Sequence, residues 1–120
     1  MINDNRARKF IEACYACAIA CERCATADLK ESDVKALTHC INLNRECAVF
    51  CIASAHILSL GGSFSNEICT LCAKICEACA DECEKHTHMQ HCKACAEACR
   101  SCARECRTMA LESWELTLAR

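Results

Sequence analysis

Cysteine is the residue whose number and spacing offer chemistry in this chain. The sequence holds 17 cysteines in 120 residues, and most of them follow one another at alternating intervals of three and four residues. Residues at that spacing share the face of an α-helix that packs inside a bundle. The thiols are therefore predicted to line a core. The groups are Cys14, Cys17, Cys21 and Cys24, then Cys40, Cys47 and Cys51, then Cys69, Cys72, Cys76, Cys79 and Cys83, and finally Cys92, Cys95, Cys99, Cys102 and Cys106.

The segments between the cysteine groups carry the signals that end and begin helices. Gly61 and Gly62 are the two glycines of a chain without proline, and they follow the second group, where a glycine suits the end of a helix. Thr87 with Gln90 reads as a capping box, which predicts a helix opening at His88. Short connections make successive helices antiparallel neighbours. We expect one all-α domain over residues 1–120, an up-down-up-down four-helix bundle with helices near 4–27, 33–60, 65–86 and 88–117.

One antiparallel register of these helices places every cysteine in the core. In that register Cys14 lies level with Cys69 and Cys106, and the next cysteines follow in layers along the axis. Asn44 fills the one position of the second helix where the pattern lacks a thiol.

Composition and charge exclude several classes of function. The formal net charge is −2, which does not suit a polybasic nucleic-acid binder. The sequence shows neither a secretory signal nor an apolar stretch long enough to span a membrane. We therefore expect a cytoplasmic protein with no membrane or nucleic-acid partner, in which the thiols are reduced rather than paired in disulfides.

A core lined by so many thiols favours a soft metal. One or two buried cysteines act as small hydrophobic residues, but 17 on one face of each helix would pack poorly without another role. Thiolates select Cu(I), which accepts two ligands, and side chains at i and i+4 start close enough to share one ion. The six such pairs are Cys17/Cys21, Cys47/Cys51, Cys72/Cys76, Cys79/Cys83, Cys95/Cys99 and Cys102/Cys106.

Two other functions remain open on the residues alone. Zinc also accepts thiolates, so a metallothionein-like buffer of zinc or cadmium is one alternative. An iron–sulfur or thiol oxidoreductase is the other, although no segment singles out one cysteine and no glycine-rich cofactor loop is present.

The repeated CxxCxxxCxxC units on four helices resemble the bacterial copper storage proteins, in particular their cytosolic branch. The resemblance covers about Phe10 to Met109. It implies a non-enzymatic store that fills a bundle with many Cu(I) ions, commonly as a homotetramer, and that exchanges copper with donor or acceptor proteins. Asn44 departs from an all-cysteine pattern at its position.

The two ends of the predicted bundle differ in chemistry. His86 and His88 continue the core positions beyond Cys83 and Cys92, and imidazole is an acceptable copper ligand, so we expect a metal entrance there. Met109 at the other end is a core residue more readily than a ligand. We expect an apolar plug at that end, made of Phe10, Leu58, Phe64, Met109, Leu111, Trp114 and Leu118.

The second predicted helix also carries apolar residues outside the cysteine positions, which indicates a subunit interface. These residues are Ile41, Leu43, Val49, Phe50, Ile52 and Ile57.

Overall fold

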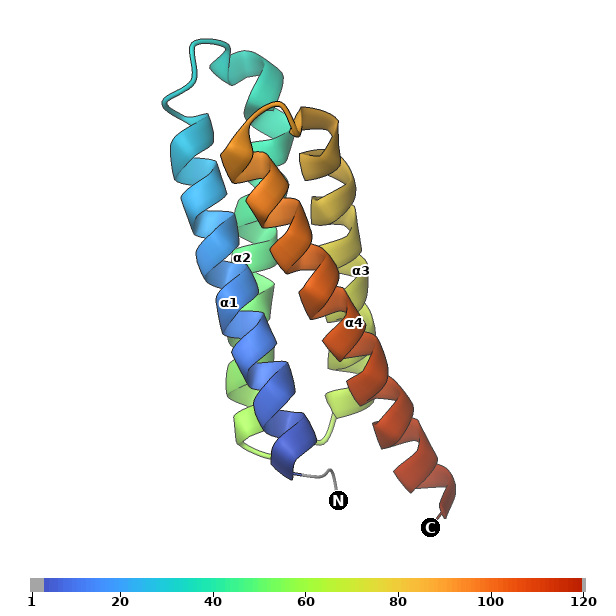
Figure 1. Ribbon diagram of the computed structural model, residues 1–120. Coiled ribbons are helices and arrows are strands. Elements are labelled where there is room, and N and C mark those ends of the chain that lie inside the picture. The colour runs from blue at the N-terminus through green and yellow to red at the C-terminus, as the bar shows by residue number, and fades with distance from the viewer. Residues whose placement is uncertain (1–3, 120) are drawn as a thin grey trace.

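The computed structural model describes the backbone of residues 4–119 and the side chains of residues 5–111. Four long helices run side by side in alternating directions, which confirms the predicted up-down-up-down bundle (Figure 1). The helices are α1 (Asp4–Asp28), α2 (Thr38–Ser59), α3 (Ser65–Cys83) and α4 (Gln90–Ala119), with the short 3₁₀ helices η1 (Val34–Leu37) before α2 and η2 (Glu84–His86) after α3.

The helices form a closed ring around one axis. Each packs against its neighbours in sequence, and α1 also packs against α4. The molecule measures 55 × 21 × 19 Å, so the narrow dimensions leave room for two helices in each direction and one column of side chains between them. The α1–α2 and α3–α4 connections lie at one end, and the α2–α3 connection lies with the termini at the other (Figure 1).

The α2–α3 connection ends α2 as the glycines predict. Gly61 has a φ of +74°, the left-handed conformation that glycine adopts without strain. The Gly61 N–H donates to the carbonyl of Leu58 at 3.1 Å, and the Gly62 N–H donates to that of Ile57 at 3.2 Å. This pair of bonds is a Schellman motif, which satisfies carbonyls that the end of the helix leaves without partners.

Three helix boundaries differ from the prediction. The predicted capping box at Thr87 is wrong, because α4 begins at Gln90 and Thr87 lies in the preceding turn. The start of the second helix and the end of the third are 3₁₀ turns rather than α-helix. Tighter 3₁₀ turns are common at helix ends, and the sequence pattern does not separate them from α-helix.

Small side chains fill most of the core. Every cysteine is fully buried, and alanines such as Ala55, Ala73 and Ala80 fill the remaining space at 0% exposure. A separate small cluster of Ala25, Leu37 and Ile41 closes the end that carries the α1–α2 connection. Ile41 is therefore part of the interior, although its place in the sequence suggested an outer face.

The other end is plugged by larger apolar residues. Phe10 and Met109 are fully buried there, and Leu58 is nearly so. Phe64 was predicted to be part of the plug, but this is wrong, because Phe64 lies in the α2–α3 connection with 65% of its surface exposed. Leu111 is also exposed. The side chains of Trp114 and Leu118 lie outside the described residues.

The α1–α2 pair and the α3–α4 pair are aligned differently along the bundle axis from the prediction. Within the α1–α2 pair the thiols face each other as expected, with the sulfurs of Cys17 and Cys47 3.8 Å apart. Between pairs the prediction is wrong by one core position. The sulfur of Cys14 contacts Cys102 at 3.9 Å, whereas Cys106 was the expected partner.

The position of the α2–α3 turn explains this shift. Residues at equal distances from the centre of an antiparallel connection face each other. Here α2 ends at Ser59 and α3 begins at Ser65, so the centre lies near Gly62, whereas the predicted alignment of Cys51 with Cys69 implied a centre at residue 60. Cys51 consequently contacts Cys72 at 4.0 Å, one core position beyond Cys69.

We expect the metal-free protein to be helical already, because its backbone hydrogen bonds and its apolar plug need no metal. Far-UV circular dichroism of chelator-treated, reduced protein measures this directly, with the same sample in denaturant as the unfolded reference. A random-coil spectrum without metal would contradict the prediction and would resemble a zinc finger, in which metal binding supplies the folding energy.

Candidate metal centre

The sulfur atoms form a continuous column along the bundle axis, which we call the thiol column. All 17 cysteines are free and buried. Sulfurs from different helices lie 3.7–4.0 Å apart, as in the contacts of Cys17 with Cys99 at 3.7 Å and of Cys47 with Cys76 at 3.8 Å. Cys21 reaches Cys79 on the diagonally opposite helix at 3.9 Å. The column is therefore filled across its width.

The thiols gather into sets of four that overlap along the axis. Within each set the four sulfurs lie within 4.8 Å of one another. A metal–thiolate bond is about 2.3 Å for zinc, so two sulfurs about 4.6 Å apart suit an ion placed between them. Sets of this kind are Cys14, Cys51, Cys72 and Cys102; Cys17, Cys21, Cys47 and Cys99; Cys17, Cys47, Cys51 and Cys76; Cys21, Cys79, Cys95 and Cys99; and Cys72, Cys76, Cys102 and Cys106.

Most of the predicted i, i+4 pairs are in direct sulfur contact. The pairs at 3.9–4.0 Å are Cys17/Cys21, Cys47/Cys51, Cys95/Cys99 and Cys102/Cys106. Cys72 and Cys76 belong to one set of four. Cys79 and Cys83 differ, because each donates a hydrogen bond to the amide oxygen of Asn44, at 3.2 and 3.5 Å.

Burial keeps outlying thiols of the column neutral. At the plugged end, loss of water raises the pKa of Cys69 to about 12. At the other end, burial together with the nearby Asp28 carboxyl raises the pKa of Cys92 to about 12. Metal binding at such thiols has to displace their protons, so affinity rises with pH.

Asp28 and His91 form a pair beside the last layer of thiols. His91 Nε2 donates to Asp28 Oδ1 at 2.8 Å, and the Cys92 thiol donates to the same oxygen at 3.5 Å. Asp28 is fully buried, and its other oxygen, Oδ2, has no hydrogen-bond partner among the described residues. Burial, with the thiol of Cys40, raises the pKa of Asp28 to about 6, and the bond from His91 opposes that rise.

His86 is held in the same way by a second carboxylate. Its Nε2 donates to Glu82 Oε2 at 2.9 Å, and Glu82 is itself buried. Burial disfavours ionisation of Glu82, but the bonds from His86 and Lys85 outweigh it and lower its pKa. A carboxylate on one ring nitrogen fixes the tautomer and leaves the other nitrogen free for a ligand. The ring of His88 lies edge-on to that of His86, with centroids 6.4 Å apart, and is exposed.

The sequence pattern correctly placed His86 and His88 near each other, but it gave no signal that His91 lies beside the thiols. His91 lies off the three-four spacing, and its partner Asp28 is on another helix, so spacing within one helix gave no signal for it. Met89 is similar, since it packs partly buried against both core clusters. The polar end of the column therefore holds more potential ligands than the a/d positions indicate.

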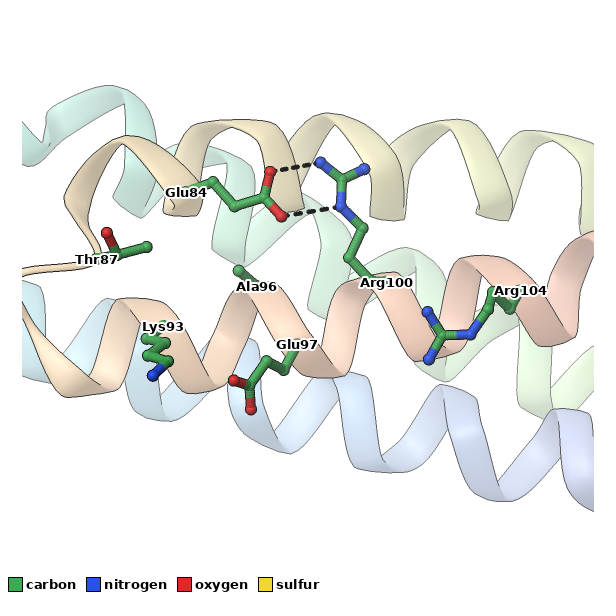
Figure 2. Close-up of a pocket in the computed structure, with 7 residues that line it drawn as sticks. All are labelled: Glu84, Thr87, Lys93, Ala96, Glu97, Arg100 and Arg104. Atoms are coloured by element: carbon green, nitrogen blue, oxygen red, sulfur yellow. Dashed lines mark hydrogen bonds and ion pairs between the residues drawn. The ribbon is translucent and has the colours of Figure 1, made fainter.

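A surface pocket near the same end contains no thiol. It lies along the outside of η2 and α4, and Figure 2 shows Arg100 reaching across to Glu84. The Arg100 Nε and Nη2 atoms donate to the two Glu84 oxygens at 3.0 and 2.7 Å. These bonds tie α4 to η2 from outside the column. The pocket is lined by Glu84, Thr87, Lys93, Ala96, Glu97, Arg100 and Arg104.

The thiol column and the bundle fold have counterparts in known proteins. A family described as copper storage protein matches residues 3–111. The chain belongs to the copper storage protein family. The match takes in α1, α2, α3 and α4 as far as residue 111, and it includes all 17 cysteines and thus the whole column described above.

Relatives of this copper storage protein share both sequence and structure. The Bacillus subtilis "uncharacterized cysteine-rich protein YhjQ" is 51% identical over 78 residues, 65% of this chain and 72% of the relative. The structure of the "Cu(I)-bound copper storage protein BsCsp3" is 48% identical with a TM-score of 0.83, covering 88% of this chain and 98% of the other. A cytosolic copper storage protein from Streptomyces lividans, solved with five coppers, is 40% identical with a TM-score of 0.86, covering 89% and 93%.

Proposed function

We propose that this protein is a copper store that holds many Cu(I) ions through the thiolates of its core, with residues 1–120 acting as one metal-binding unit. The observation that carries the proposal is the column of free, buried sulfurs, nearly all of which lie 3.7–4.0 Å from at least one other sulfur. Family membership supports it, as does the Cu(I)-bound state of the relative BsCsp3. The proposed ligands are the 17 cysteines of the column, with His86 and His88 at its polar end.

Charge balance in the core favours Cu(I) as the cargo. No lysine or arginine is buried among the described residues, so the core offers no cation to neutralise thiolates. Uncompensated charge in such a core costs free energy. One Cu(I) for each thiolate leaves no net charge, whereas a closed zinc site of four thiolates carries two negative charges. Thiolates that bridge two ions supply both with ligands, so capacity approaches one ion for each of the 17 cysteines.

Storage accounts for the burial of the thiols better than catalysis does. A redox enzyme needs an exposed, activated cysteine. Every cysteine here has 0% exposure, and the surface pocket of Figure 2 lacks a thiol. A buried column instead suits a non-enzymatic role in which copper is buffered and shielded from redox cycling.

We propose a cytosolic location for this store. The relative from Streptomyces lividans is described as cytosolic, and free thiols are stable in that reducing compartment. None of the described helices has the length and apolar character needed to cross a membrane. Copper would then pass between this protein and cytosolic donor or acceptor proteins.

The polar end is the proposed entrance for copper. At this end the partly buried imidazole of His86 is oriented by Glu82, and His88 lies next to His86 at the surface. Imidazole is a harder ligand than thiolate and holds Cu(I) less tightly, which suits a transient station. Phe10 and Met109 close the opposite end, and a dehydrated ion would have few ligands there.

The α1–α2 side of the bundle is the proposed subunit interface of a homotetramer. Val49 is 70% exposed, and Ile52, Tyr15 and Ile19 are each about half exposed. Exposed apolar residues concentrated on neighbouring helices mark association surfaces. Phe50 is partly buried against the chain's own core and so contributes less to this surface than the sequence indicated. On the α3–α4 side, ion pairs such as Arg107 with Glu77 at 2.7 Å are typical of a solvated face.

Anaerobic titration with Cu(I) against a competing chelator tests the storage function. We expect well over ten ions per chain at saturation, because bridging thiolates allow about one ion per cysteine. Parallel titrations with Zn(II) and Fe(II) are the controls. Saturation at one to four copper ions, or tight zinc binding at four thiolates per ion, would contradict the proposal.

Replacing both entrance histidines should slow copper transfer without reducing capacity. We expect His86→Ala with His88→Ala to lower the rate of copper removal by a chelator about tenfold, the scale on which groups around a metal site act. Capacity should stay the same, since the thiol column is intact. His56→Ala, an exposed histidine near the other end of α2, is the matched control. Unchanged rates in the double variant, with altered rates in Met109→Leu, would place the entrance at the plugged end.

Charge placed on the α1–α2 surface should dissociate the oligomer. We expect Ile52→Asp to lower the mass measured by sedimentation equilibrium from a tetramer towards a monomer, because a buried carboxylate at the interface has no partner. Leu71→Asp, at an equally exposed apolar position on α3, should leave the mass unchanged. A monomeric wild-type protein would remove the proposed interface.

A further inference from the structure

The last layer of the thiol column, at the plugged end, holds only two cysteines. The sulfurs of the layer before it lie within 4.8 Å of one another and belong to Cys14, Cys51, Cys72 and Cys102. The next core position towards the plugged end lies three or four residues further along each helix. We call the residues there, all with 0% exposure, the closing layer; they are Phe10, Ser54, Cys69 and Cys106.

Cys69 is the one thiol of the described residues without a close sulfur neighbour. Every other cysteine lies 4.0 Å or less from another sulfur. Cys106 of the same layer is among them, because its sulfur contacts Cys102 at 3.9 Å. The Cys69 thiol has no hydrogen-bond partner within the described part of the chain, and Cys72 and Cys14 act on it only electrostatically.

Ser54 lies level with Cys69 on the neighbouring helix, and its hydroxyl is also without a partner. Cys51 of α2 contacts Cys72 of α3 at 4.0 Å, so the next core positions of these antiparallel helices, Ser54 and Cys69, lie opposite each other. The Ser54 Oγ is buried and makes no hydrogen bond to any described residue. A buried hydroxyl in that state destabilises a fold, so its presence calls for a state in which it has a partner.

Copper binding at Cys69 creates such a partner. When an ion binds there, copper remains Cu(I), a Cu–S bond forms, and the thiol releases its proton to the solvent. The bound thiolate keeps part of its negative charge and accepts hydrogen bonds. Cys72, one turn along α3, is placed to supply the second thiolate. A hydroxyl is too hard to be a good ligand for Cu(I) itself, so the contribution of Ser54 is the hydrogen bond.

Resting on the proposed function, we infer that Ser54 is a positioning residue for a terminal copper site at Cys69, in the closing layer. The Ser54 hydroxyl rotates to donate to the Cys69 thiolate when that site is loaded. No lysine or arginine is buried among the described residues, so a neutral donor has to stabilise this thiolate. The ion at Cys69 is the most weakly held in the column, because close sulfur neighbours that could bridge ions are missing there.

Equilibrium competition for copper tests this role. Protein loaded anaerobically with Cu(I) is equilibrated with increasing bicinchoninate, and the ions retained per chain are counted from the absorbance of the Cu(I) chelate. Ser54→Ala should bind its weakest ion about tenfold to hundredfold less tightly than the wild type, the size of effect expected for one hydrogen bond to a charged group. The other ions should be held as in the wild type. Ser101→Ala, the same substitution at an exposed position of α4, is the matched control.

Unfolding of the metal-free protein separates this role from a merely structural one. Ser54→Ala removes an unpaired hydroxyl, so the urea midpoint of the metal-free variant should equal or exceed that of the wild type. Weaker binding of one ion without a loss of stability is the result expected of a positioning residue. A lower midpoint together with the loss of several ions at once would overturn the inference.

Variants of Cys69 identify the site. Cys69→Ala should bind about one ion fewer than the wild type, and the ion lost should be the weakest. Adding Ser54→Ala to Cys69→Ala should change copper binding no further, because the partner of the hydroxyl is already gone. Ser54→Cys places a sulfur opposite Cys69 and should hold the terminal ion at least as tightly as the wild type does.

The outcomes distinguish this inference from the proposed function. If Ser54→Ala holds every ion as tightly as a wild type that binds well over ten, the role of Ser54 is overturned and storage stands. Equal weakening by Ser54→Ala with and without Cys69 has the same meaning, as does loss of a tightly held ion in Cys69→Ala, a test that leaves α2 unaltered. Failure of the wild type to bind many Cu(I) ions overturns both.

Discussion

Contact between the sulfurs requires the four helices to lie close together, and the rest of the structure depends on that closeness. Only small side chains permit it. Alanine and cysteine fill nearly the whole interior, and Cys21 touches Cys79 across the diagonal of the bundle at 3.9 Å. A larger residue at a central position would separate the helices and open the column at several layers. The same small residues that provide ligands therefore also set the spacing of those ligands.

A core of this kind limits how the fold is stabilised. Alanine and cysteine bury little apolar area, so the large residues at the ends contribute more than their number suggests. Full burial of a side chain such as Phe10 is worth about 2–3 kcal/mol. The pair of Arg6 with Glu105 joins α1 to α4 at 2.6 Å, and Arg100 joins α4 to Asp81 of α3. Such partly exposed pairs contribute at most about 1 kcal/mol each. Apolar residues thus stabilise both ends of the bundle, and the largest fully buried ones, Phe10 and Met109, lie at the plugged end.

The fold and the candidate ligands could be predicted from the cysteine spacing, whereas the alignment of the helix pairs could not. Steps of three and four residues predict the helices, their inner faces and the burial of every thiol, because helical periodicity is a local property. The level at which the helix pairs meet depends on the centre of the α2–α3 turn at Gly62, which the cysteine spacing alone does not specify, although Gly61 and Gly62 mark that turn in the sequence. His91 was missed for a related reason. Its role at the site depends on Asp28, which lies on a different helix at 2.8 Å.

The alternating direction of the helices has an electrostatic consequence for a charged cargo. Each end of the bundle presents two helix N-termini and two C-termini, whose partial charges of about half a unit have opposite signs. Along the central axis these dipoles largely cancel, so the helix backbones impose almost no field that drives a monovalent cation inwards or outwards. Net movement then depends on the gradient of occupancy and on the affinity of successive ligands. A column whose helix dipoles cancel is suited to fill and to empty through the same opening.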